Sequence, residues 1–154
     1  MKTFRRVLTL AVSVLLVSLA TDPCHAKELG KTHSRFSIAG ITKEQEMTSF
    51  FAKFQVAVAR RDRNKVAAMV HFPLEVTLAT GSRRKMTGRD EFLAQFDNIF
   101  DQKFSATIAG MREESLLANG SGVATPLGEV WFQKKGKGAS RAIRVVKING
   151  VVRQ

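Results

Sequence analysis

The chain has 154 residues, a length that suggests one domain, and its 25 basic residues outnumber 13 acidic ones. The net charge of +12 implies attraction to polyanions, anionic lipid head groups or acidic proteins. The single cysteine, Cys24, excludes an intramolecular disulfide and a cysteine-based metal site. Since there are also only three histidines, we expect no metal ion and no cofactor.

Residues 1–26 have the pattern of a secretory signal peptide. The basic residues at its start are Lys2, Arg5 and Arg6. An almost uninterrupted apolar run follows over residues 7–20, shorter than the roughly 20 residues that a membrane-spanning helix needs. Small residues end this run, and they predict cleavage after Ala26, with Ala20 as the alternative site.

Two other interpretations of this segment are an uncleaved membrane anchor and lipid attachment at Cys24, although Asp22 and Pro23 do not fit a lipoprotein signal. We expect a bacterial periplasmic or secreted protein with no transmembrane anchor in its mature chain. Cleavage after Ala26 removes three basic residues and Asp22, which leaves 22 basic and 12 acidic residues and a net charge of +10.

The first half of the mature chain predicts helices and a two-stranded ribbon. A flexible lead-in over residues 27–41 is expected to precede a domain over residues 42–154. The expected elements are a helix opening at Thr42, a helix over 63–70 capped by Asp62, strands over 74–78 and 83–86, and a helix that follows Thr87 and runs to Phe100.

The second half predicts strands. They are expected over residues 104–109, 115–125, 129–133 and 141–149. Asn119–Gly120 marks a turn within the second of these segments, and a cationic hairpin loop covers residues 134–140. Helices segregated from an antiparallel sheet make an α+β fold.

This order of elements resembles the nuclear transport factor 2-like superfamily, also called SnoaL-like or cystatin-like. The segments behind the resemblance are FFAKFQVAVARRDRNKVAAMV, HFPLEV, KMTGRDEFLAQFDNIF, GEVWF and IRVVKIN, which lie within residues 42–150. The resemblance implies a cone-shaped, curved antiparallel sheet packed against three helices, an apolar cavity, and a homodimer formed through the sheet. It implies no particular reaction, because the same fold hosts isomerases, cyclases, hydro-lyases and binding proteins.

No convincing catalytic set is present in the sequence. Enzymes of the superfamily commonly pair an acid–base residue with a tyrosine, and this chain has no tyrosine. His71, Asp97 and Glu129 are weak catalytic candidates, because histidine and carboxylates can move protons. Each has a simpler interpretation as a structural or surface residue. Candidate ligand-binding residues are His71, Glu75, Phe96 and Trp131.

Three basic clusters predict a cationic surface. They are Arg60, Arg61 and Arg63; Arg83, Arg84 and Lys85; and Lys134, Lys135 and Lys137. Proteins that bind nucleic acid commonly have exposed aromatic residues among their cations, and these clusters have none. We therefore expect an anionic envelope component or an acidic protein as partner, and no nucleic acid.

The leading hypothesis is an exported domain without enzymatic activity that binds a small apolar ligand or a protein partner in or around its cone. The first alternative is a SnoaL-like isomerase, cyclase or hydro-lyase that uses His71 and a carboxylate. The second is a basic periplasmic inhibitor or immunity-type protein that acts through its cationic surface.

Overall fold

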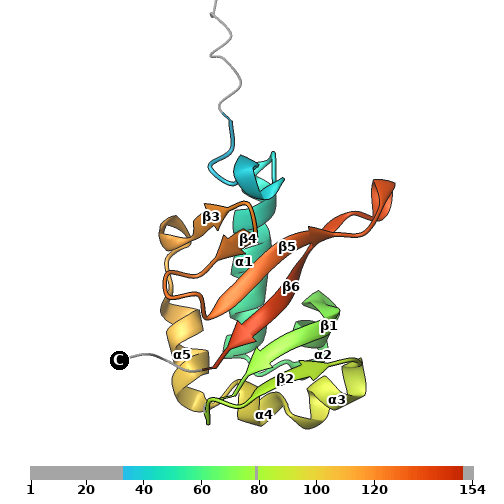
Figure 1. Ribbon diagram of the computed structural model, residues 1–154. Coiled ribbons are helices and arrows are strands. Elements are labelled where there is room, and N and C mark those ends of the chain that lie inside the picture. Colours follow the sequence, from blue (N-terminus) through green and yellow to red (C-terminus); the bar gives the residue numbers. More distant parts are fainter. Residues whose placement is uncertain (1–32, 79, 151–154) are drawn as a thin grey trace, which may run out of the picture. The chain divides into compact units, whose positions relative to one another are not determined.

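The computed structural model describes residues 33–78 and 80–150 (Figure 1). The helices are α1 (Glu44–Ala59), α2 (Arg63–Met69), α3 (Arg89–Ala94), α4 (Phe96–Ile99) and α5 (Gln102–Gly110), with short 3₁₀ turns η1 (Ser37–Ala39), η2 (Glu113–Ser115) and η3 (Gly138–Ser140). The strands are β1 (Val70–Thr77), β2 (Arg83–Met86), β3 (Leu117–Asn119), β4 (Gly122–Ala124), β5 (Val130–Lys135) and β6 (Ala142–Asn149). The expected signal peptide and Cys24 lie outside the described residues.

The six strands form one mixed, open sheet in the order β2-β1-β6-β5-β4-β3. Every neighbouring pair is antiparallel except β1 and β6, which run parallel. The expected α+β class is confirmed, but the expectation of a wholly antiparallel sheet is wrong. The alternation of apolar and polar residues defines the two faces of a strand, and it carries no information about strand direction.

The part of the chain that the structure describes has five α-helices where three were expected. The helix expected up to Phe100 is divided into α3 and α4 at Gln95, whose φ of −101° and ψ of 4° interrupt the helix. The strand expected over residues 104–109 is wrong, because this segment forms α5. Asp101 caps α5 by accepting a hydrogen bond from the Phe104 N–H at 2.7 Å, and Phe104 and Ile108 share its buried face.

The sequence predicted the N-terminal capping residue correctly for α2 and incorrectly for α1. The Asp62 side chain caps α2 as expected, accepting a hydrogen bond from the Lys65 N–H at 3.1 Å. The predicted cap at Thr42 is wrong, since α1 begins one residue later, after Lys43, whose side chain makes no capping bond.

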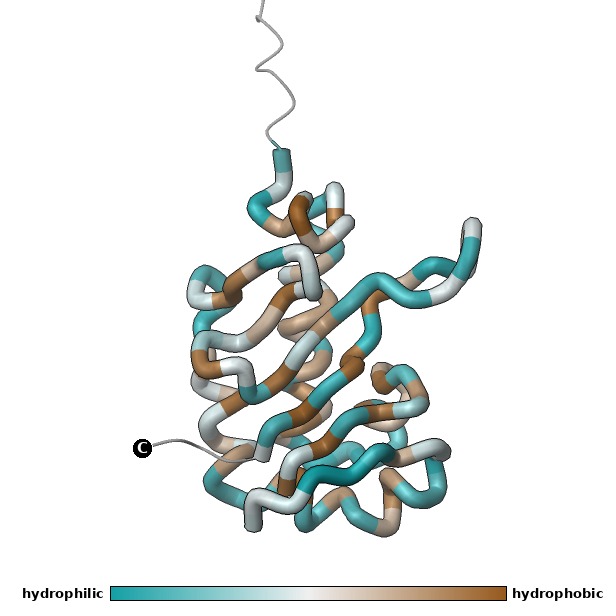
Figure 2. The backbone as a smooth tube through the Cα atoms, viewed as in Figure 1, coloured by the Kyte–Doolittle hydropathy of each residue, from teal (hydrophilic) through white to brown (hydrophobic). Residues whose placement is uncertain are grey.

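Phenylalanine side chains fill the space between the helices and the sheet. Phe132 of β5 contacts Phe50, Phe51 and Phe54 of α1 edge-on, with ring centroids 5.7–5.9 Å apart. Such ring pairs each add roughly 0.5–1.5 kcal/mol beyond the burial of apolar area. Figure 2 shows hydrophobic and hydrophilic residues alternating along the strands, as expected for a sheet with one face in this core.

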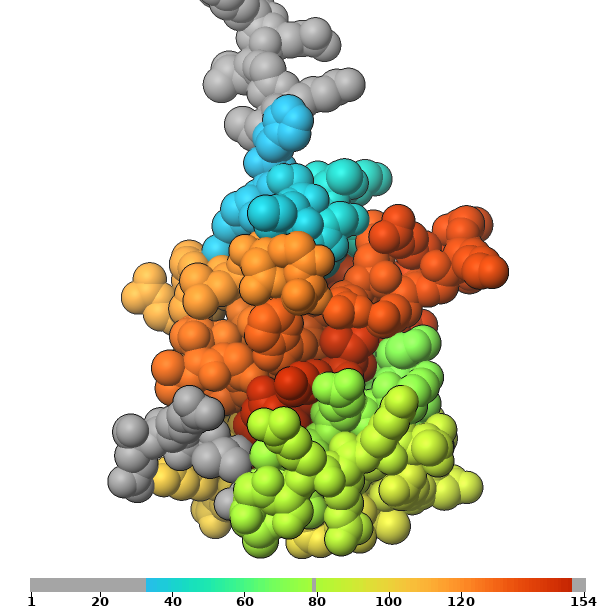
Figure 3. Space-filling model, in the orientation of Figure 1, coloured from blue at the N-terminus to red at the C-terminus, as the bar shows by residue number. Residues whose placement is uncertain are grey.

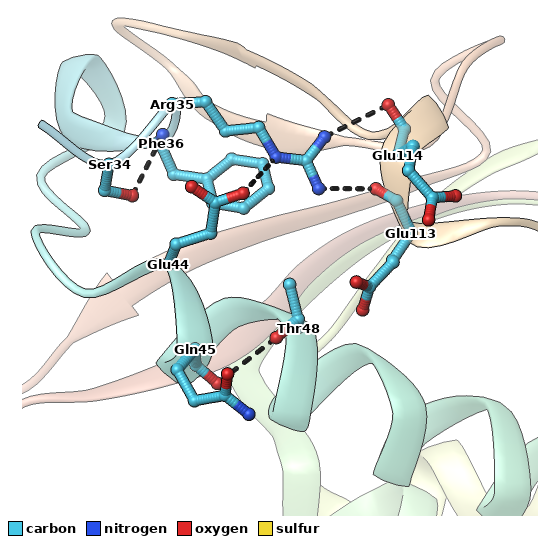
Figure 4. Close-up of polar contacts among 8 residues, drawn as sticks. All are labelled: Ser34, Arg35, Phe36, Glu44, Gln45, Thr48, Glu113 and Glu114. Atoms are coloured by element: carbon cyan, nitrogen blue, oxygen red, sulfur yellow. Dashed lines mark hydrogen bonds and ion pairs between the residues drawn. The ribbon is translucent and has the colours of Figure 1, made fainter. Parts of the chain in front are cut away.

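Residues 33–41, which belong to the expected lead-in, pack onto the domain, and Phe36 and Ile41 are fully buried. Arg35 joins this segment to two distant parts of the chain (Figure 4). Its guanidinium donates to Glu44 Oε1 at 2.7 Å and to the carbonyl oxygens of Glu113 and Glu114 at 2.9 and 3.0 Å. Residues 33–41 are therefore part of the folded domain.

Candidate binding site on the open face of the sheet

The helices cover one face of the sheet and leave the other face open (Figure 1). A groove of about 480 Å³ crosses this open face. Its lining residues are His71, Pro73, Glu75, Lys85, Ser121, Trp131, Gln133, Lys135, Val146 and Lys147. We call it the sheet groove, and Figure 3 looks onto the same side of the molecule, where β1 and β2 meet β5 and β6.

Four lining residues form a row across four neighbouring strands. Lys85 of β2 is the register partner of Glu75 of β1, and Glu75 is in turn the partner of Lys147 of β6. Lys147 is the partner of Trp131 of β5. Because directly paired residues place their side chains on the same face, the row carries two ammonium groups around one carboxylate, with an indole ring at its end.

The sheet groove has a net positive charge. Lys85, Lys135 and Lys147 line it, and Glu75 is its single carboxylate. Lys147 Nζ lies 3.9 Å from Glu75 Oε2, and both side chains are substantially exposed. Since exposed ion pairs contribute only about 0–1 kcal/mol, the carboxylate holds neither neighbouring lysine firmly.

Gln133 and Trp131 form the end of the sheet groove near β4. Gln133 donates from its side-chain amide to the Ser121 carbonyl oxygen at 2.7 Å. The Trp131 indole lies beside the turn between β4 and β5, where a Cβ on Gly128 would come within 3.4 Å of the indole Nε1. The indole therefore lies next to a glycine, where the chain has no side chain to cover it.

The structure brings together three of the four predicted ligand-binding residues. His71, Glu75 and Trp131 all line the sheet groove. Phe96 lies elsewhere, because the apolar stripe that contains it faces the core, where its ring is fully buried and contacts Phe92 and Phe100.

The two other carboxylates that we considered for catalysis have different surroundings. Asp97 accepts hydrogen bonds from Arg61 and, at 2.7 Å, from Arg63, and it does not line the sheet groove. Glu129 is 3% exposed and accepts hydrogen bonds from the Thr125 hydroxyl at 2.6 Å and the Leu127 N–H at 3.1 Å. These contacts assign Asp97 to a surface ion cluster and Glu129 to the turn between β4 and β5.

The members of the three predicted basic clusters have different surroundings. Arg61 and Arg63 bind Asp97, and Lys134 Nζ lies 2.7 Å from Glu46 Oε2. Lys85 and Lys135 line the sheet groove, and a neighbouring hollow on β1 and β2 is lined by Arg83 and Arg84. The remaining members of the three clusters are Arg60 and Lys137, which are exposed.

Sequence reasoning missed Lys147, which stands at the centre of the row. Alternation from the buried Ile143 and Val145 predicts that Val146 rather than Lys147 points to the open face. The register between β5 and β6 shifts between Trp131 and Phe132, and this irregularity brings Lys147 opposite Trp131. The adjacent apolar residues Val145 and Val146, followed by Lys147 and the buried Ile148, mark this change of phase in the sequence.

Over residues 33–78 and 80–150, no three potential metal ligands among histidine, cysteine and carboxylate side chains come together. Within the same ranges, none of the helices combines the length and apolar character needed to cross a membrane. Comparison of the chain with protein-family models, with curated proteins and with solved structures gives no match.

Proposed function

We propose that this protein is a binding protein that holds an anionic organic ligand in the sheet groove. The row of Lys85, Glu75, Lys147 and Trp131 across four strands is the observation that carries the proposal. Ammonium groups form charge-assisted hydrogen bonds with carboxylate, sulfate or phosphate oxygens, and the indole offers a flat surface to a ring. The volume of about 480 Å³ falls within the range of small-molecule sites.

The residues that line the sheet groove favour an anionic ligand over the apolar ligand that the sequence predicted. An apolar molecule inside the cone was the expectation from the superfamily resemblance. Phenylalanine side chains occupy the layer between α1 and the sheet, whereas the open face offers lysines and Trp131. A charged ligand on the open face is therefore better supported than an apolar ligand in the interior.

We also propose that the protein belongs to the nuclear transport factor 2-like superfamily and is exported. The order of two helices, two strands, further helices and four strands supports the first proposal. The basic start and apolar run of residues 1–26 support the second. Mass spectrometry of protein recovered from the periplasm tests export, and a chain that begins at Lys27 is the expected result.

The test of ligand binding uses the fluorescence of Trp131, the single tryptophan of the chain. The probes are isophthalate, a flat dianion, and isophthalamide, its uncharged counterpart of the same shape. We expect isophthalate alone to change the fluorescence, and roughly tenfold weaker binding in Lys85→Gln and Lys147→Gln. Lys103→Gln, on the exposed part of α5, is the matched control. Equal binding of both probes, or no effect of the two groove variants, would contradict the proposal.

An enzymatic role is the second candidate, because His71 and Glu75 line the same groove. Either side chain can move a proton to or from a molecule bound in the groove. His71→Ala should then abolish turnover of the ligand while isophthalate still binds. A variant that kept full turnover would remove His71 from the mechanism.

A further inference from the structure

A second groove lies on the helical side of the domain, between α1 and α2. Its volume is about 570 Å³, and its walls are almost entirely apolar. Phe50 and Val56 of α1 and Met69 of α2 are among its lining residues, and Val56 is 51% exposed. We call it the helix groove. A hollow of this kind is more apolar than an ordinary stretch of protein surface.

Cations surround the apolar walls. Lys53 lines the helix groove from α1, Arg60 lines it from the C-cap position that follows α1, and Lys65 lines it from α2. Lys53, Val56 and Arg60 are spaced by three and four residues, so they share one face of α1. The two cations lie seven residues apart, which is about 10.5 Å along the helix axis.

Most of this positive charge is available to an incoming group. Asp62 is the carboxylate among the lining residues, and its Oδ2 lies 2.8 Å from Lys65 Nζ. Lys53 and Arg60 form no ion pair with any carboxylate of residues 33–78 and 80–150. An apolar groove edged by two cations that have no ion-pair partner in the described part of the chain selects an occupant that is apolar on one side and acidic beside it.

We propose that the helix groove binds an acidic amphipathic helix of a partner protein. A helix laid along a groove between two helices buries one apolar face and leaves its outer face in water, which suits an open hollow. Carboxylates seven residues apart on the partner helix match Lys53 and Arg60. An apolar residue between them, at the fourth or fifth position, meets Val56.

Charge argues against two other occupants. A second copy of this chain, related by a two-fold axis, would bring Lys53 and Arg60 against the same cations, and like-charge contacts across an interface are unfavourable. The N-terminal residues 1–31 carry five basic and two acidic side chains, and their net positive charge does not complement the cations of the helix groove. Charge complementarity therefore favours a foreign acidic segment.

This proposal is independent of the sheet groove, since the two grooves share no lining residue. The isophthalate titration and the experiment below can therefore succeed or fail separately. A partner helix on α1 and α2 also leaves the open face of the sheet accessible to a ligand.

The test uses two fluorescein-labelled helical peptides and the full mature chain. One peptide has glutamates at its first and eighth positions and leucines at the fourth and fifth, and the other has lysines in place of the glutamates. Fluorescence anisotropy should show the acidic peptide binding about tenfold or more tightly than the basic one. Val56→Asp, at an exposed position of α1, should weaken binding of the acidic peptide by a similar factor.

The double variant Lys53→Glu/Arg60→Glu should reverse the preference, binding the basic peptide and rejecting the acidic one, whereas Lys103→Glu should keep the original preference. A reversed preference also shows that the double variant is folded. The proposal is overturned if neither peptide binds, if both bind equally, or if the double variant keeps the original preference. Saturable binding of dodecanoate without binding of the acidic peptide would identify a small amphiphile as the occupant and would equally overturn it.

Discussion

Glu75 and Lys147 face each other across β1 and β6, the one parallel pair of the described sheet, with Oε2 and Nζ 3.9 Å apart. This separation is longer than a hydrogen bond. The carboxylate therefore lowers the positive potential around Lys147 without fixing its position. An anionic ligand in the sheet groove would compete with Glu75 for the same ammonium group.

Removing the charge of Glu75 should strengthen binding of the anionic ligand. Glu75→Gln keeps the size of the side chain and removes the repulsion, so isophthalate should bind roughly two- to fivefold more tightly. The free energy of unfolding should change by less than about 1 kcal/mol, because the pair is exposed. Fluorescence titration and urea unfolding measure the two effects, and weaker isophthalate binding by this variant would place the ligand away from the row.

Glu129 should matter for stability and not for binding. Glu129→Ala leaves the Thr125 hydroxyl and the Leu127 N–H without their acceptor in the turn between β4 and β5. An unsatisfied buried donor costs about 1–3 kcal/mol, and the Leu127 N–H is only partly buried, so we expect a loss of roughly 1–3 kcal/mol in urea unfolding. Glu129→Gln keeps one oxygen acceptor and should lose less. Equal stability of wild type and Glu129→Ala would show that the two hydrogen bonds do not support the turn.

Local patterns predicted much of the fold. The strand at residues 83–86 has the expected bounds, and the turn at Asn119–Gly120 joins β3 to β4. Segment 104–109 was assigned to the wrong type of element, because a short apolar segment fits both helical and strand periods. The segment is a helix in which the Asp101 side chain accepts the capping hydrogen bond, and Phe104 and Ile108, four residues apart, share the buried face.

The candidate site was harder to predict, because it depends on pairing between distant strands. His71, Glu75 and Trp131 were candidates as isolated residues, and nothing in the sequence indicates that they line one groove. These residues line one groove because β6 lies between β1 and β5 in the sheet. This order also places Lys147 between Glu75 and Trp131. Phe96 was misplaced because a phenylalanine in an apolar stripe can line either a core or a pocket.

Gly122 should tolerate no side chain. Its φ is +134°, and a Cβ at this position would lie 2.5 Å from the Phe132 carbonyl oxygen. Backbone strain alone costs about 1–3 kcal/mol, and the contact with β5 adds to it, so Gly122→Ala should destabilise the protein strongly in urea unfolding. Gly120→Ala, two residues away, meets no atom within 4 Å and is the matched control. Similar losses in both variants would contradict the close approach of β4 to β5.

Asp62 should make stability depend on acid pH. In the folded state the pKa of the Asp62 carboxyl lies below its ordinary value of 3.8, first because the Lys65 side chain donates a hydrogen bond to it and second because the Lys65 N–H does. A lowered folded pKa means that the ionised carboxylate stabilises the fold at pH values above 3.8, and that this contribution is lost as pH falls through the folded pKa. Urea unfolding should therefore show wild type more stable than Asp62→Asn near neutral pH, with the difference disappearing in acid.

Lys65→Gln separates the charge of the pair from the helix cap. It removes the largest cause of the lowered pKa of Asp62 and keeps the Lys65 N–H as donor to the Asp62 carboxylate. In this background the loss of stability caused by Asp62→Asn should be smaller near neutral pH and should disappear at a pH closer to 3.8. An undiminished loss would mean that the backbone cap alone, without the lysine ammonium, holds the Asp62 carboxylate in its charged form.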